Sequence, residues 1–165
     1  DVYKRQILYS SSEDNSKTQV EEFTILAEKA GYKVLPYSVP STNEIASTMN
    51  VMTGKVDAIW IPIDNTIASA FSTVVSSNQT VKKPIYPSAT AMVKEGGLGS
   101  VVVDQKELGV AAGKMTAKIL KGAKPANTAV EIFNTGKTVI NKKVAAQLGI
   151  TIPDDVLKKA GQIIE

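Results

Sequence analysis

The chain has 165 residues, 43% of them hydrophobic, which is typical of one globular α/β domain and not of a disordered segment. The 19 basic and 16 acidic residues leave a formal charge of +3, and the lysines cluster only as scattered pairs, which argues against a nucleic-acid surface. The sequence has no cysteine and no histidine, which excludes thiolate metal sites, disulfides and imidazole-dependent triads. We therefore predict no catalytic residue, no metal and no cofactor, so the protein is not expected to be an enzyme.

Short β-branched runs alternate with helical patterns over the first part of the chain. The predicted strands cover residues 7–10, 33–39, 56–63 and 84–88. Between the first two, Val20, Phe23 and Ala27 recur at helical spacing. The run 56–63 is apolar almost throughout, as expected of a parallel strand covered by helices on both faces. This order predicts an α/β fold with a parallel, doubly wound sheet and flanking helices.

The pattern changes after Gly96 and Gly97. The predicted elements there are a strand at 100–104, a helix that carries Leu108, Met115 and Ile119, a strand at 129–133, and short helices after Asn141 and Pro153. No apolar run approaches the length of about 18 residues that a membrane-spanning helix needs.

Polar loops follow the predicted strands of the sheet. In open parallel sheets, ligands bind at the carboxyl ends of the strands, so the loops after residues 10, 63, 88 and 104 are candidates. None of these loops has the glycine pattern that cradles phosphate. The predicted ligand-binding residues are Ser10, Ser12, Asn15, Asp64, Asn65, Thr66, Ser88 and Asp104.

These residue types leave more than one interpretation open. Hydroxyls and free helix amides suit a carboxylate, whereas Asp64 and Asp104 suit an ammonium group or sugar hydroxyls, so together they suit a zwitterion. Helix capping alone explains Asn15, Asn65 or Thr66 equally well. The alternative of an acid/base pair of Asp104 with Glu107 is less favoured than a hinge and a cap.

Residues 7–23, 55–70, 101–125 and 139–160 form four segments that follow the pattern of a known family. In this order they resemble the tryptophan/tyrosine/phenylalanine-type substrate-binding family of ABC importers. The first resembles the family's loop Y-N-P-x-E-x-N-S, with Ser10 and Ser11 where Asn-Pro is usual. The Asp-Asn-Thr at 64–66 is among the most specific matches, as is the closing Asn…Leu-Gly-Ile…Pro segment. The resemblance covers nearly all of the chain from Ile7 and implies a lobe of the periplasmic-binding type I fold.

The resemblance also implies a division of the chain, since family members are roughly twice as long. Residues 7–98 would form the C-terminal ligand-binding lobe, residues 99–125 a strand–helix segment that belongs to a missing N-terminal lobe, and residues 126–165 the return to the C-terminal lobe. A small ligand, with an aromatic or other amino acid favoured, would bind between the lobes and pass to ABC permease subunits. The protein would be extracytoplasmic, either periplasmic or a lipoprotein at the cell surface, with its signal sequence and any membrane anchor outside this chain.

Two other classes of protein remain as alternatives. The effector-binding domain of a LacI-type transcription regulator shares the fold that the resemblance implies. A small flavodoxin-like or hydrolase domain acting alone would need a phosphate loop or a nucleophile–base pair, and the sequence offers neither.

Overall fold

The computed structural model describes residues 3–133 and 136–165. The strands are β1 (Lys4–Ser10), β2 (Lys33–Val39), β3 (Ala58–Ile61), β4 (Ile85–Pro87), β5 (Gly99–Val102), β6 (Lys137–Asn141) and β7 (Gln162–Ile164). The α-helices are α1 (Asp14–Lys29), α2 (Ile45–Thr53), α3 (Asn65–Ser69), α4 (Phe71–Asn78), α5 (Thr90–Glu95), α6 (Gln105–Leu120), α7 (Lys142–Leu148) and α8 (Asp154–Lys159). Short 3-10 turns cover Thr42–Glu44 and Pro125–Asn127. No helix in these ranges is long and apolar enough to cross a membrane.

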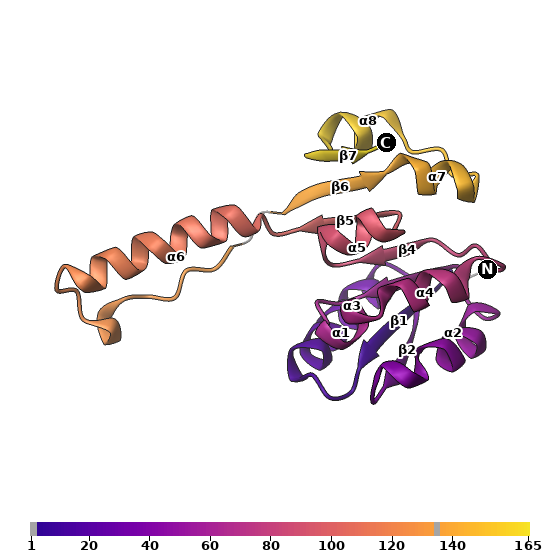
Figure 1. Cartoon of the computed structure of the whole chain (residues 1–165), viewed down its shortest axis with the longest axis horizontal. Coiled ribbons are helices and arrows are strands. Elements are labelled where there is room, and N and C mark those ends of the chain that lie inside the picture. The colour runs from indigo at the N-terminus through magenta and orange to yellow at the C-terminus, as the bar shows by residue number, and fades with distance from the viewer. Residues whose placement is uncertain (1–2, 134–135) are drawn as a thin grey trace.

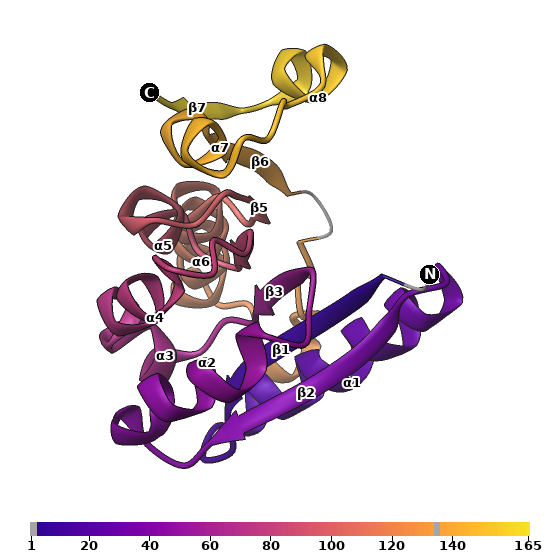
Figure 2. The ribbon, with the colours of Figure 1, turned by 90° about the vertical axis from the view of Figure 1, so that its right-hand side faces the viewer.

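The first sheet has the strand order β2-β1-β3-β4, and all its strands are parallel. Because successive side chains of a strand point to opposite faces, Ile7 and Leu8 of the central strand β1 enter different cores. Ile7 packs with Val20 and Ala27 of α1, whereas Leu8 packs with residues of α2, α4 and α5. Figure 2 shows α1 and α2 on opposite sides of β1 and β2. The prediction of a parallel, doubly wound α/β sheet with flanking helices is confirmed.

The second sheet has the order β5-β6-β7, in which β6 runs antiparallel to β5 and parallel to β7. Leu98 joins the two sheets, because its N–H donates to the Ile85 carbonyl at 2.8 Å and its own carbonyl accepts from Asn141 N–H at 2.9 Å. The helix α5 contributes Met92 to the core of the first sheet and Val93 to that of the second. The two sheets therefore form one body.

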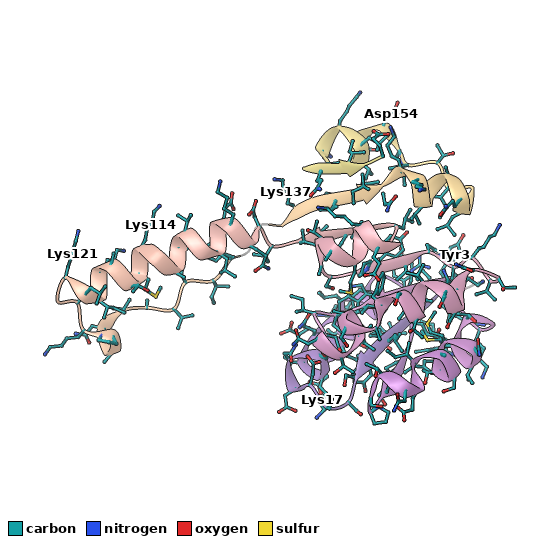
Figure 3. The ribbon with its side chains drawn as sticks, in the orientation of Figure 1. Tyr3, Lys17, Lys114, Lys121, Lys137 and Asp154 are labelled. Carbon is teal, nitrogen blue, oxygen red and sulfur yellow. The ribbon has the colours of Figure 1, made fainter. Side chains whose placement is uncertain are left out.

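The helix α6 and the segment 121–133 project from this body as an arm (Figure 1). The helix has no buried residue, and Leu120 is 83% exposed. On the returning segment, Val130 and Ile132 are exposed as well. The side chains of Lys114 and Lys121 extend from the arm into its surroundings (Figure 3). The arm thus lacks the apolar burial that stabilises the helices of the body.

One prediction about this part of the chain is wrong. Residues 129–133 form no strand, because no neighbouring strand in the described ranges offers them a hydrogen-bonding partner. Residues 99–102 form β5 and pair with β6, so the part that projects from the body begins near Asp104 (Figure 1). The helices predicted after Asn141 and Pro153 are confirmed as α7 and α8, whereas the strands β6 and β7 were not predicted.

Gln6 is a polar residue in the middle of β1 and is fully buried. Its side-chain Nε2 and Oε1 have no hydrogen-bond partner among the described residues. An unsatisfied buried polar group costs about 1–3 kcal/mol, so we expect Gln6→Met to raise the free energy of unfolding by about 1–2 kcal/mol. Urea denaturation of the 165-residue chain measures the change, with the exposed Gln147→Met as control. An unchanged or lower value for Gln6→Met would contradict the prediction.

Candidate functional site

The loops that follow β1, β3 and β4 gather at one edge of the first sheet, because these strands are parallel. Lys17 marks this edge, and Tyr3 lies toward the opposite one (Figure 3). Hydrogen bonds join the neighbouring loops, as when Ser88 Oγ donates to the Ile61 carbonyl at 2.7 Å. The structure brings together most of the predicted ligand-binding residues, namely Ser10, Ser12, Asn15, Asp64, Asn65, Thr66 and Ser88.

Asp64 is only 2% exposed, and protein donors surround its carboxylate. Oδ1 accepts from Ile67 N–H at 2.9 Å and so caps the first turn of α3. Oδ2 accepts from Ser10 N–H at 2.6 Å and from Ser16 Oγ at 2.8 Å. No lysine or arginine of the described ranges forms a salt bridge with it. The carboxylate therefore fastens the loop after β1 to the loop after β3.

Glu13 makes a second connection between the same two loops. Its Oε2 accepts from the backbone N–H and the side-chain Nδ2 of Asn65, both at 3.1 Å. Its Oε1 accepts from the backbone N–H of Thr66 at 2.7 Å and from Thr66 Oγ1 at 2.9 Å. Asp64 accepts from the backbone N–H of Ile67, so the first three backbone N–H groups of α3 all donate to Glu13 or Asp64.

The remaining polar groups of this edge are more accessible. Ser12 is exposed, and its Oγ lies 2.7 Å from the Oγ of the buried Ser10. Asn15 is exposed and donates from Nδ2 to the Ile63 carbonyl at 2.7 Å, which leaves its Oδ1 free of any hydrogen bond within the described residues. Hydroxyl and amide groups of this kind can hold a small polar ligand.

Asp104 lies apart from the other predicted residues, at the base of the arm. It caps α6 by accepting from Lys106 N–H at 2.9 Å and Glu107 N–H at 3.3 Å. These hydrogen bonds, with a smaller contribution from Lys137 at 3.7 Å, hold the pKa of the Asp104 carboxyl below its ordinary value. No hydrogen bond or ion pair in the described ranges links it to the loops after β1, β3 and β4. In the structure Asp104 is therefore the cap of α6.

An apolar pocket of about 570 Å³ lies beside Ser88, on the face of the sheets that also carries Trp60. Its lining comprises Trp60, Tyr86, Ser88, Leu98, Gly99, Ser100, Val101, Thr138, Val139, Ile140, Ile150, Thr151, Ile152, Pro153 and Val156. Trp60 is held by stacking on Phe23, with ring centroids 4.1 Å apart. Burial raises the pKa of the Tyr86 hydroxyl, and the charge of Arg5 partly offsets this rise. The volume suits a small apolar molecule, and no charged side chain lines the pocket.

Glu13 is the residue that the sequence prediction missed. The candidate loop contains it, but its position before the first helix gives no sign of a contact with residues 65 and 66. The available signal was the glutamate of the family's loop pattern, which falls at this position. No group of three potential metal ligands occurs among the described residues.

Because of the hydrogen bonds to the Glu13 carboxylate, we expect the free energy of unfolding to depend on pH in the acid range. Burial alone would raise the pKa of Glu13, but the hydrogen bonds from Asn65 and Thr66 outweigh it and the net shift is downward. A carboxyl with a lowered folded-state pKa stabilises the fold above its unfolded-state pKa, and this contribution is lost as the pH falls below the ordinary value of 4.5. We expect Glu13→Gln to lose stability at pH 7 and to converge with the unchanged chain at low pH, measured by urea denaturation. Parallel pH curves for the two proteins would contradict this expectation.

The family model described as ABC transporter substrate binding protein matches residues 1–164. Among curated proteins, a tyrosine-binding protein of Clostridioides difficile (strain R20291) is 29% identical over 136 residues, which cover 82% of this chain and 39% of that protein.

Two solved structures are also similar. The first is an ABC domain in complex with L-Trp from Streptococcus pneumonia, 72% identical with a TM-score of 0.94. The second is a ligand-free, open structure of a substrate-binding protein with adhesive properties from Clostridium difficile, 26% identical with a TM-score of 0.78. Each match covers 99% of this chain and 55% of the solved chain, so the chain spans about half the length of these relatives.

Proposed function

Because this chain belongs to the ABC transporter substrate-binding protein family, we propose that it supplies most of one lobe of an extracytoplasmic protein that binds an aromatic amino acid for import. The family match over residues 1–164, together with the 72% identity to a structure that holds L-Trp, carries this proposal. The tyrosine-binding relative supports the same class of ligand. These relatives give no support to the alternative of a transcription regulator's effector-binding domain.

The arm supports a two-lobe arrangement. We assign the body, residues 7–102 and 137–165, to one lobe, and we place the arm from α6 to residue 133 on a second lobe that the unmatched part of the relatives would supply. The absence of buried residues on α6 and the exposure of Val130 and Ile132 support this assignment, because apolar side chains of this kind need a covering surface.

A ligand held between two lobes acts by shifting an equilibrium. It favours the closed arrangement only to the extent that it binds that arrangement more tightly than the open one. That one relative is described as ligand-free and open supports such a movement in the family. The closed form would then deliver the amino acid to ABC permease subunits.

The strand-end loops are the proposed contacts on this lobe. The exposed groups of Ser12 and Asn15 suit direct hydrogen bonds to the ligand, and Ser88 adds a hydroxyl. Ser10 and Asp64 are buried and would act by holding these loops in place.

Binding can be tested in a hybrid protein, in which this chain replaces the matching part of the pneumococcal relative. Calorimetric titration with tryptophan, tyrosine and phenylalanine should give a dissociation constant of about 1 μM or tighter for at least one of them. A hexose and a nucleobase serve as control ligands. Binding of a control ligand and of none of the three amino acids would overturn the proposed ligand class.

A further inference from the structure

Glu13 connects the loop after β1 to the loop after β3. This connection lies beyond the last residues at which the two strands pair. The paired register of β1 and β3 runs only from Arg5↔Ala58 to Ile7↔Trp60. Past these residues no backbone ladder joins the two segments, so side chains determine how far apart the loops lie. Asp64 makes the buried connection and Glu13 makes the outer one, at the surface where a ligand would arrive.

The hydrogen bonding of the Glu13 carboxylate is complete. Each oxygen of the Glu13 carboxylate accepts two hydrogen bonds, one from a backbone N–H and one from a side chain. Charge-assisted hydrogen bonds are shorter and stronger than neutral ones, so this cluster fixes the start of α3 relative to the start of α1. With four donors in place, the carboxylate has no remaining lone pair directed at a ligand.

The neighbouring contacts depend on the same spacing. Asn15 lies two residues after Glu13 and reaches the Ile63 carbonyl, and Gln19 Oε1 accepts from Ile63 N–H at 3.1 Å. A shift of the loop after β1 would move the exposed groups of Ser12 and Asn15 away from those of Asn65. Such a displacement reduces affinity for the ligand, because the polar groups of the two loops no longer converge on it.

We propose that Glu13 is a positioning residue for ligand binding, which sets the spacing of the loops after β1 and β3 through Asn65 and Thr66 without contacting the ligand. This inference rests on the proposed function. The competing explanation is a cap that stabilises the fold and has no influence on the ligand. Both explanations predict lower stability when Glu13 is changed, so stability alone does not separate them.

Asn78 provides a matched control at the opposite edge of the sheet. Its side chain clamps a single residue from both sides, donating to the Lys83 carbonyl at 2.7 Å and accepting from Lys83 N–H at 3.1 Å. It is buried at 9% exposure and lies outside the strand-end loops. Asn78→Ala therefore removes a comparable side-chain clamp without touching the ligand loops.

The experiment measures the affinity of the hybrid protein for its amino acid at a temperature where circular dichroism shows every variant folded. We expect Glu13→Ala to weaken binding by about tenfold or more, Glu13→Gln to fall between Glu13→Ala and the unchanged hybrid because it keeps one acceptor oxygen, and Asn78→Ala to stay within about twofold. If Glu13→Ala does not fold, the isosteric Glu13→Gln decides.

Two results would overturn the inference. The first is binding by the Glu13 variants within twofold of the unchanged hybrid, which leaves the proposed function intact. The second is an equal loss of affinity in Asn78→Ala, which would attribute the effect to general destabilisation. An unchanged hybrid that binds no amino acid would instead overturn the proposed function and this inference with it.

Discussion

Replacing Asp64 with alanine is expected to lower the free energy of unfolding of the chain by about 3 kcal/mol. The change removes a buried carboxylate that accepts three hydrogen bonds, and it leaves the N–H groups of Ser10 and Ile67 buried without partners. A natural domain has a total stability of about 5–15 kcal/mol, so this is a large share of it. Urea denaturation at neutral pH measures the loss.

Asp57 is a suitable control for this experiment. It also accepts a backbone hydrogen bond from a segment distant in sequence, from Lys4 N–H at 2.8 Å, but it is exposed to solvent. We expect Asp57→Ala to cost less than about 1 kcal/mol, because water replaces the lost contact. Equal losses for the two variants would contradict the role assigned to Asp64.

The second large effect concerns hydrogen exchange in the arm. The helices α1 and α6 both have 16 residues, but α1 buries Ser16, Val20 and Ala27 and α6 buries none. An isolated helix of this length is marginal in water, whereas helices of the body open only with much of the fold. We expect the α6 amides of the 165-residue chain to exchange at least about 1000-fold faster than the α1 amides.

Mass spectrometry of peptides from the two helices measures this difference. In the hybrid protein, the α6 amides should slow toward the rate of α1, because the second lobe would cover the helix. Slow exchange of α6 in the 165-residue chain alone would contradict the two-lobe proposal. Unchanged fast exchange in the hybrid would contradict it as well.

The periodicity of hydrophobic residues in the sequence was sufficient to predict the parallel sheet. An almost continuous apolar run predicts the strand at 56–63, and β3 lies inside that range with helices on both faces. Such patterns are informative because the hydrophobicity of each residue indicates whether that residue is buried. The edge where Asp64, Asn65 and Ser88 gather followed from the parallel order alone.

The failures share a different cause, namely a dependence on partners distant in sequence. The mostly apolar segment 129–133 predicts a strand, but a strand forms only when another strand pairs with it. The strand β7 has three residues, too few for a recognisable alternation, and it exists because β6 lies beside it. The role of Glu13 likewise depends on Asn65 and Thr66, more than fifty positions away. No local pattern carries that information.

The attachment of the arm has a mechanical consequence. The arm leaves the body from two adjacent strands, whose last paired residues are Val102 and Lys137. Because α6 has no buried residue, packing against the body does not hold the arm in one orientation. The 16 residues of α6 make a lever about 24 Å long. A rotation of about 10° at the base would carry its tip through about 4 Å, farther than a hydrogen bond is long.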